Sequence, residues 1–357
     1  MNGPVMIVAG GTGGHVYPGI AVAEVLRAQG CELCWMGTQR GVEARVVPAA
    51  GLELLTIPVS GLRRSGLLRW LAAPFMLATA VACAVKHMLR VRPALVLGMG
   101  GFVSGPGGFA AWLCRRPLVI HEQNAIAGLT NRLLARFARR VLEAFPATFP
   151  AAVHAIETGN PVRAAISDIA AARRRDGAGL QVLVFGGSRG ARALNEQVPR
   201  ALAACNVSGL RVRHQCGAAD AAATRARYAE LGLADVVVED YIDDMVSAYA
   251  AADLVIARAG ATSIAEIAAA GVAAVLVPYP YAVDDHQTAN ARFLADHAAA
   301  VLAPEPTIAT PAFTELLAGL LRDPARRAAL GANALARARP QAAVAVARQC
   351  LEVADAG

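Results

Sequence analysis

The stretch VMIVAGGTGGHVYPG (Val5–Gly19) decides the fold class of this chain. Its first residues form a short apolar run without alternation, as expected of a parallel strand that is covered on both faces. Four glycines gathered around Thr12 follow this run, and His15 comes directly after them. A strand, a glycine-rich turn and a helix start in this order are typical of the first βα unit of a Rossmann-like domain.

The same rhythm continues along all 357 residues. Short apolar runs recur at a spacing of roughly 20–35 residues, which is the spacing of βα units. A second glycine-rich turn, Phe185–Gly190, follows the first run of the second half. We therefore predict an α/β fold with two Rossmann-like, doubly wound parallel-sheet domains that face a cleft. The predicted strands are VMIVAG, CELCWMG, LELLTIP, ALVLGMG, PLVIHEQ and RVLEAF, and then LQVLVFGG, LRVRHQCG, DVVVED, DLVIARAG, VAAVLVPYP and AAVLAP.

The boundary between the two domains is predicted near Gly159–Arg163, where a glycine and a proline end a strand. The first domain then covers residues 1–161, and the second covers residues 162–340. The last predicted helix lies in the segment 341–357, which we expect to pack back on the first domain. Ligands of open parallel sheets bind beyond the carboxyl ends of the strands, so the motifs of both domains should meet in one cleft.

The first glycine turn lacks the two commonest nucleotide-binding signatures. From Gly11 onward the third glycine of the dinucleotide fingerprint is missing, and the second strand ends at Trp35–Gln39 without an acidic residue. No GxxxxGK[ST] run of a triphosphate loop occurs. What remains is a set of backbone N–H groups at a helix start, which suits an anion such as a diphosphate.

The charge and the cysteine content limit the classes of protein to which this chain can belong. The formal net charge of +7 suits a phosphorylated substrate, an anionic lipid surface or a nucleic acid without choosing among them. The seven cysteines include one CxxC pair, Cys31 and Cys34, but this pair lies inside an apolar strand and has no second pair for zinc. We expect thiols in a reducing compartment, and the N-terminus lacks the pattern of a signal peptide.

Four further clusters lie where predicted strands end and helices begin. Six glycines between Gly98 and Gly108 predict that the backbone approaches something closely at this position. His121–Asn124 follows the strand PLVI at the edge of the sheet where side chains reach a ligand. In the second half, Ala257–Glu266 and Asp284–Asn290 each open a helix.

Eight motifs occur in one order over almost the whole chain: GGTGGHVYPG, GMGGFVSGPGG, HEQNAIAG, TGNPVR, GGSRGA, YIDDM, ARAGATSIAEI and DDHQTANA. This set resembles the MurG family of bacterial cell-wall glycosyltransferases, which have the GT-B fold. The resemblance implies that UDP-N-acetylglucosamine (UDP-GlcNAc) donates its sugar, with inversion, to the 4-hydroxyl of the muramyl sugar of lipid I. UDP leaves and lipid II forms, which is a step of peptidoglycan synthesis.

The resemblance also implies roles for the residues at matching positions. The first turn lies by the acceptor and by the sugar-phosphate side of the donor, and the other residues contact the donor. Asn124 and Gln287 contact its sugar, Arg163 and Ser188 lie at UDP, Ile242 meets the uracil and Glu266 binds the ribose. The implied substrate-binding set is Thr12, Gly13, Gly14, Asn124, Arg163, Ser188, Ile242, Ala261, Thr262, Ser263, Ile264, Ala265, Glu266 and Gln287.

An inverting transfer needs a base near the acceptor hydroxyl and stabilisation of the leaving diphosphate. His15, at the mouth of the first turn, is the candidate base, because an imidazole ordinarily titrates near neutral pH. A purely structural role in ordering the turn is the alternative for His15, and His121 is the second candidate base. GT-B enzymes generally do without a bound metal in the reaction, and no acidic pair suggests one, so we expect no cofactor.

Two positions depart from the family pattern. Many members carry a tyrosine where this chain has Phe102, so a hydroxyl that could contact the acceptor is missing there. Thr262 and Ser263 stand where some members have leucine and threonine, a change that should leave a role of the backbone intact.

Apolar and basic residues are mixed in the segment 62–76. The uncharged run from Trp70 to Val85 has 16 residues, fewer than the ~20 that span a bilayer. We therefore predict no transmembrane helix but a peripheral contact with the anionic, cytoplasmic face of the inner membrane. A buried helix with a solvated basic rim is the alternative. The predicted contact residues are Arg64, Leu67, Leu68, Arg69, Trp70 and Phe75, and Lys86, Arg90, Arg92, Trp112, Arg115 and Arg116 add to them.

Other functions fit parts of the sequence. A GT-B transferase with another glycolipid or a soluble acceptor keeps the chemistry, although the basic-apolar segment argues against a soluble acceptor. A non-catalytic module that binds sugar nucleotides at a membrane is disfavoured by His15 and His121. We expect no nucleic-acid partner, since no DNA or RNA motif accompanies the basic charge and aromatic residues make up only 5 %.

Overall fold

The computed structural model describes residues 3–59, 67–172, 179–187 and 190–356. The chain divides into two compact units: Met1–Arg163 together with Gln341–Gly357, and Ala164–Pro340. The division falls just after Arg163, so this residue belongs to the first unit, although the sequence suggested a boundary before it. The last helix, α15 (Ala342–Asp355), packs against α1 (Gly13–Ala28) within the first unit.

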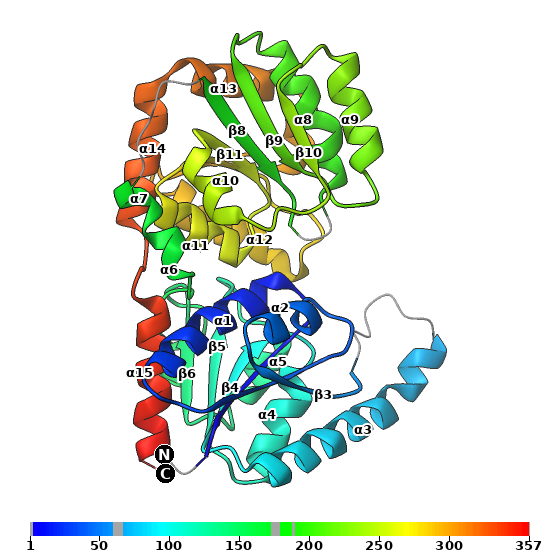
Figure 1. The fold of residues 1–357 in the computed structure, drawn as a ribbon, viewed down its shortest axis with the longest axis vertical. Coiled ribbons are helices and arrows are strands. Elements are labelled where there is room, and N and C mark those ends of the chain that lie inside the picture. Colours follow the sequence, from blue (N-terminus) through cyan, green and yellow to red (C-terminus); the bar gives the residue numbers. More distant parts are fainter. Residues whose placement is uncertain (1–2, 60–66, 173–178, 188–189, 357) are drawn as a thin grey trace. The chain divides into compact units, whose positions relative to one another are not determined.

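The first unit is built on a seven-stranded parallel sheet with the strand order β3-β2-β1-β4-β5-β6-β7 (Figure 1). The chain starts in the middle of the sheet, runs to one edge and then crosses to the other side, as in a doubly wound fold. Six of the strands are the apolar runs predicted from the sequence. The strands are β1 (Val5–Ala9), β2 (Leu33–Gly37), β3 (Glu53–Thr56), β4 (Leu95–Gly100), β5 (Leu118–Glu122), β6 (Arg140–Glu143) and the additional short β7 (Ile156–Glu157).

Helices cover both faces of this sheet, because neither face of an apolar parallel strand can remain in water. In β1, Val5 and Ile7 join a core with α1 and α15, whereas Met6 and Val8 join a second core on the opposite face. The helices of the unit are α1, α2 (Glu43–Ala49), α3 (Leu67–Val91), α4 (Ser104–Leu113), α5 (Leu129–Leu134) and α15, with a 3₁₀ turn at Ala151–Val153.

The second unit has a six-stranded parallel sheet with the order β10-β9-β8-β11-β12-β13. Its strands are again the six predicted runs, which confirms the expected α/β class with two Rossmann-like, doubly wound parallel sheets. The strands are β8 (Leu180–Phe185), β9 (Leu210–Gln215), β10 (Val236–Glu239), β11 (Leu254–Ala257), β12 (Ala273–Leu276) and β13 (Val301–Leu302). The helices are α6 (Ala164–Ser167), α7 (Ile169–Ala172), α8 (Arg192–Ala204), α9 (Ala221–Glu230), α10 (Met245–Ala251), α11 (Ala261–Ala270), α12 (His286–Ala295), α13 (Pro311–Arg322) and α14 (Pro324–Ala336), with 3₁₀ turns at Val283–Asp285 and Glu305–Ala309.

The cysteines are free thiols, as the sequence predicted. Cys34 of the CxxC pair is buried in β2, and burial raises its pKa to about 12. A thiol in this state is neither a nucleophile nor a metal ligand near neutral pH, because both roles need the thiolate.

The helix α3 carries part of the predicted membrane segment. Its residues Ala80, Ala84 and Met88, spaced four apart, are fully buried, whereas the side chain of Phe75 is 78 % exposed. Among the described residues, Ala73–Val91 is the one helical stretch whose length and apolar composition would allow it to cross a bilayer. The side chains of Leu67, Leu68, Arg69 and Trp70, and the whole of Arg64, lie outside the part of the chain that the structure describes.

The packing of α15 on the first unit can be tested with two valines of the same helix. Val346 is fully buried, so Val346→Ala is expected to lower the free energy of unfolding by about 1–3 kcal/mol through lost burial and the remaining cavity. Val344 is 43 % exposed, and Val344→Ala should change it by less than about 0.5 kcal/mol. Urea denaturation followed by circular dichroism measures both, and equal effects would contradict the packing.

Candidate active site

The first glycine turn connects β1 to α1 and is held by a carboxylate from α2. Glu43 is fully buried and accepts hydrogen bonds from the backbone N–H of Gly11 (2.9 Å), the backbone N–H of Thr38 (3.0 Å) and the Thr38 hydroxyl (2.7 Å). The N–H of Gly11 is therefore directed to the protein itself. The turn offers a ligand fewer N–H groups than the sequence suggested.

Three glycines make the space that this carboxylate occupies. A Cβ atom on Gly10 would lie 2.5 Å from a carboxylate oxygen of Glu43, and one on Gly37 would lie 2.8 Å from its Cγ. A Cβ on Gly41 would overlap the carboxylate. A side chain at any of these positions would force the buried carboxylate away from its donors, which explains why glycine stands at all three.

The second glycine cluster packs directly against the first turn. Gly101 has a φ of +82°, and a Cβ there would overlap the carbonyl oxygen of Gly10. Phe102 is half-exposed, and its ring lies within 4 Å of the position of a Cβ on Gly11. The predicted close approach is therefore real, and its partner in these contacts is the protein's own first turn.

His15 begins a chain of side-chain contacts that leads into the core. Its Nδ1 lies 3.0 Å from Oε1 of Gln123, and Nε2 of Gln123 lies 3.1 Å from Nδ1 of His121. Nε2 of His121 lies 3.0 Å from the carbonyl oxygen of Gly159. His121 is fully buried, and burial lowers its pKa to about 4. The two predicted histidines are thus joined through Gln123, which the sequence did not single out.

Asn124 lies in the loop after β5, and Glu122 organises this loop. One carboxylate oxygen of Glu122 accepts the backbone N–H of Asn124 (3.0 Å) and its side-chain amide (3.1 Å). The other oxygen accepts from the N–H of Gly128 (3.1 Å) and the amide of Asn131 (2.9 Å). The side chain of Asn124 is thereby held at the carboxyl end of the sheet.

Arg163 closes the first unit's part of the site. Its guanidinium carbon lies 5.3 Å from the centre of the Tyr17 ring, an arrangement of a cation over an aromatic face. Tyr17 lies at the start of the second turn of α1, two residues after His15. Thr12, Gly13, Gly14, His15, Asn124 and Arg163 therefore lie at strand ends and helix starts of a single unit.

In the second unit, the turn between β8 and α8 is also fitted around a carbonyl. Gly190 has a φ of +73°, and a Cβ there would overlap the carbonyl oxygen of Cys216 at the end of β9. The same carbonyl accepts the amide of Asn195 (2.9 Å), whose oxygen lies 3.1 Å from Nε2 of the buried His214. The predicted residue Ser188 lies outside the described residues.

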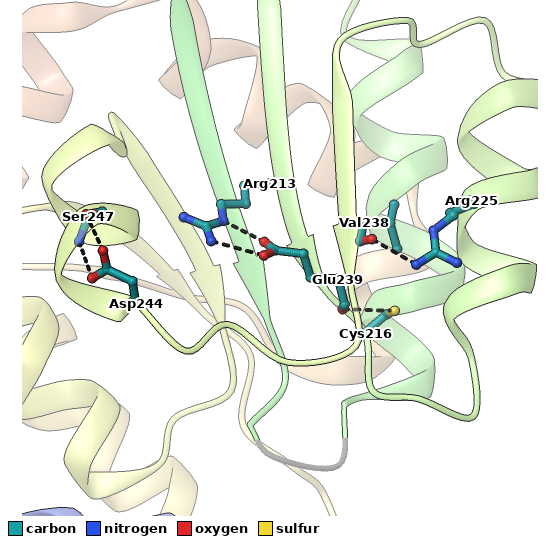
Figure 2. A network of polar contacts seen from close by, with 7 residues as sticks. All are labelled: Arg213, Cys216, Arg225, Val238, Glu239, Asp244 and Ser247. Carbon is teal, nitrogen blue, oxygen red and sulfur yellow. Dashed lines mark hydrogen bonds and ion pairs between the residues drawn. The ribbon is translucent and has the colours of Figure 1, made fainter.

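The loop that carries Ile242 is fastened at both ends (Figure 2). Before it, Arg213 on β9 binds both carboxylate oxygens of Glu239 on β10, at 2.6 and 3.1 Å. After it, Asp244 caps the start of α10 by accepting the N–H of Ser247 (3.0 Å). Ile242 itself is buried, so its side chain is not exposed on the surface of this unit.

The helix α11 presents the run Ala261–Glu266. Ala261 and Ile264 are buried, whereas Thr262, Ser263 and Ala265 are partly exposed. Glu266 is also buried and accepts a hydrogen bond from the Tyr249 hydroxyl (3.2 Å). This contact fixes one carboxylate oxygen.

The last predicted residue, Gln287, lies near the start of α12. It accepts the N–H of Tyr279 (2.9 Å) through Oε1. Before it, Asp284 and Asp285 both have positive φ values (52° and 51°), a strained backbone that is common at functional sites. Among the described residues, no group of three His, Cys, Asp or Glu side chains could hold a metal ion.

Three residues of the site were missed by sequence reasoning: Glu43, Gln123 and Tyr17. Gln123 lies in the HEQN motif, so its closeness to His121 in the sequence was apparent. Its contact with His15 was not, because 108 positions of sequence separate the two residues. In the sequence, only the glycines near Glu43 distinguish it from other glutamates.

Comparison with known proteins gives full-length matches. The glycosyltransferase family 28 N-terminal domain matches residues 5–143, and the family 28 C-terminal domain matches residues 181–346. A curated UDP-N-acetylglucosamine--N-acetylmuramyl-(pentapeptide) pyrophosphoryl-undecaprenol N-acetylglucosamine transferase from Alkalilimnicola ehrlichii is 52 % identical over 359 residues, covering 99 % of this chain and 100 % of the relative. The protein of the same description from Nitrosococcus oceani is 50 % identical over 355 residues, covering 98 % and 99 %.

Solved structures agree with these matches. The crystal structure of Acinetobacter baumannii MurG is similar with a TM-score of 0.80 and 42 % identity, and the match covers 98 % of this chain and 99 % of that one. A glycotransferase of kitacinnamycin matches with a TM-score of 0.69 at 17 % identity, covering 98 % and 99 %, which shows a common fold alone.

The role of Glu43 in holding the first turn can be tested by Glu43→Gln. The amide NH₂ group would face N–H or O–H donors in place of an acceptor oxygen. We expect the free energy of unfolding to fall by about 1–3 kcal/mol. Glu24→Gln on the exposed side of α1 is the control and should change it by less than about 0.5 kcal/mol. If chemical denaturation gives equal stabilities for wild type and Glu43→Gln, the carboxylate does not hold the turn.

Proposed function

This chain belongs to glycosyltransferase family 28, and on that premise we propose that it transfers N-acetylglucosamine from UDP-GlcNAc to the 4-hydroxyl of the muramyl sugar of lipid I. The reaction inverts the anomeric centre, releases UDP and gives lipid II for peptidoglycan synthesis. The fold is GT-B, and the chain is an N-acetylglucosamine transferase. The observation that carries the proposal is the match at about half identity over the full length of the relatives.

We assign the acceptor, the membrane side and some of the donor contacts to the first unit, and most of the donor contacts to the second. In the first unit, Thr12, Gly13 and Gly14 meet the acceptor and the donor's sugar-phosphate side. Asn124 contacts the donor sugar, and Arg163 helps to neutralise the leaving UDP, since an arginine binds phosphate oxygens with several donors. In the second unit, the proposed donor contacts are Ser188, Ile242, Ala261, Thr262, Ser263, Ile264, Ala265, Glu266 and Gln287.

His15 is the proposed base. It lies in the first turn of α1 at the carboxyl end of the sheet and is partly exposed, so a substrate hydroxyl has access to it. His121 does not fit this role, because it is fully buried and both of its ring nitrogens lie within hydrogen-bond distance of protein groups. Its place in the structure supports a positioning function.

The first unit also carries a surface suited to an anionic membrane. Phe109 and Trp112 on α4 stack with ring centres 5.4 Å apart, and Phe137 packs against Trp112 at 4.9 Å. All three rings are partly exposed, and Trp112 is 46 % exposed. Exposed leucines flank them: Leu113 on α4, and Leu129 and Leu133 on α5. Stacked rings that stay partly exposed, on and beside helices that also expose leucines, indicate a binding surface.

The charged residues in the chain segment that carries these rings are almost all basic. Between residues 54 and 142 the sequence contains twelve Lys and Arg residues against one acidic residue, Glu122, which is buried. The net positive charge of the chain is therefore concentrated in the unit that carries the exposed aromatic rings. We propose that this face, with Phe75 on α3, rests on the anionic cytoplasmic side of the inner membrane, where a lipid-linked acceptor would lie.

The transfer itself can be measured with purified protein, radiolabelled UDP-GlcNAc and a short-chain analogue of lipid I. We expect label in the lipid product and release of UDP. His15→Ala should lower kcat by about 10²- to 10⁴-fold with donor binding unchanged, because general base catalysis contributes in this range. His297→Ala, an exposed histidine on the other unit, is the matched control. Donor binding without transfer would remove lipid I as the acceptor and point to another glycolipid.

Membrane contact can be measured by sedimentation with vesicles that contain or lack anionic lipid. The protein should bind anionic vesicles, and Arg136→Gln should weaken this by about fivefold, since one arginine near such a surface contributes about 1 kcal/mol. Trp112→Ala should weaken binding as well, whereas Leu335→Ala on α14, also exposed, should not. Negligible binding of the wild type to both kinds of vesicle would contradict the proposed face.

A further inference from the structure

We propose that Gln123 is a positioning residue that holds His15 in a single neutral tautomer, with the ring proton on Nδ1 and the lone pair on Nε2. Its catalytic consequence rests on the proposed function, in which His15 removes the proton of the acceptor hydroxyl. The assignment of the tautomer itself rests on the contacts of four groups: His15, Gln123, His121 and the carbonyl of Gly159.

The direction of this hydrogen-bond chain is fixed at its inner end. The carbonyl oxygen of Gly159 can only accept, so Nε2 of His121, 3.0 Å away, carries the proton. Because burial lowers the pKa of His121 to about 4, the ring is neutral near pH 7 and has one proton. Nδ1 of His121 is therefore an acceptor, and the group that faces it must be a donor.

Gln123 supplies that donor, and this fixes the orientation of its amide. Its Nε2 lies 3.1 Å from Nδ1 of His121 and 3.3 Å from the backbone carbonyl oxygen of the same residue. Both of these atoms accept, so the amide NH₂ must point toward them and the amide oxygen must point away. Gln123 is 1 % exposed, so a flipped amide would face these acceptors without access to bulk water.

The outer end of the chain is His15. The amide oxygen of Gln123 can only accept, and it lies 3.0 Å from Nδ1 of His15. The Nδ1 position must then be protonated, and Nε2 is the nitrogen left to take up a proton in the neutral ring. A base that is oriented by a third group in this way is the general arrangement of an activated catalytic histidine.

The backbone leaves room for this contact at one position. Gly100, at the end of β4, has a φ of +100°, and a Cβ there would lie 2.6 Å from Nδ1 of His15 and 3.3 Å from Oε1 of Gln123. A side chain at this position would separate the imidazole from the amide. The glycine therefore protects the contact between the two side chains.

The tautomer can be read directly by NMR. Long-range ¹H–¹⁵N spectra of protein labelled at the histidine rings distinguish a protonated Nδ1 from a protonated Nε2, and His15→Gln assigns the signals. We expect His15 with its proton on Nδ1 in the wild type. Gln123→Met, of similar volume without polar atoms, should abolish this preference, whereas Gln123→Glu keeps an acceptor beside Nδ1 and should preserve it. A proton on Nε2 in the wild type would overturn the proposal, whatever the activity.

Kinetics test whether Gln123 acts through His15. Gln123→Met should lower kcat by about 10- to 100-fold, part of what a general base contributes, with little change in KM for UDP-GlcNAc. In a His15→Ala background the same substitution should have no further effect on kcat, because the group it positions is gone. An equal loss in both backgrounds would show that Gln123 does not act through His15.

A second pair of variants tests the contact without changing either side chain. Gly100→Ala should reduce kcat and disturb the His15 signals, because its Cβ would push the imidazole from the amide. Gly30→Ala also has a positive φ (80°) but open space around the Cβ, so it controls for backbone strain and should leave both unchanged. Equal effects would assign the loss to strain and count against the proposal. Full activity of His15→Ala, by contrast, would remove the base role and leave the tautomer to the spectra alone.

Discussion

A buried carboxylate is the interaction on which the first unit's site depends. Glu43 is fully buried and accepts three hydrogen bonds, two of which come from the backbone N–H groups of Gly11 and Thr38. A buried charge without such partners would be costly. The carboxylate therefore fixes the course of the turn from β1 to α1. It thereby also fixes the position from which the His15 side chain projects. The glycines around it are a consequence of the volume it needs.

In the second unit, an amide side chain holds the first turn in place of a buried carboxylate. Its first turn is fitted around the carbonyl of Cys216 through Gly190, and Asn195 holds that carbonyl from α8. Behind Asn195 lies His214, whose pKa burial lowers to about 3, and whose Nδ1 lies 2.9 Å from the Tyr228 hydroxyl. Asn195 also donates to the carboxylate of Asp220 (2.9 Å), so an acidic side chain takes part in this network as well.

Charge and exposed apolar surface separate the two units more clearly than the fold does. Both are parallel sheets covered on two faces, yet the net positive charge of the sequence lies in the first unit, which also carries the partly exposed rings of Phe109, Trp112 and Phe137. Ala80, Ala84 and Met88 of α3 are fully buried. They anchor the helix on the first unit, although α3 also carries exposed apolar residues. One side of α3 packs against the core of the first unit, and the other side is exposed and available for contact with lipid.

By itself, the sequence determined the strands and the positions of the turns. An apolar run such as Val5–Val8 and a glycine-rich turn after it are local patterns, and the parallel sheets follow from repeating them. The identity of the family was readable for a similar reason, since its motifs are contiguous. The fold class and the histidine at the first turn were therefore predictable.

The tertiary structure alone decided what these residues contact. Glu43 reaches Gly11 across 32 residues, and His15 meets Gln123 across 108 residues. The full burial of His121 could not be predicted from the sequence either, because a histidine at a strand end can face either the ligand or the core. Such outcomes depend on which strand ends become neighbours in the folded sheet. The direction of a hydrogen bond and the burial of a side chain depend on these neighbours in space, which local sequence patterns do not reveal.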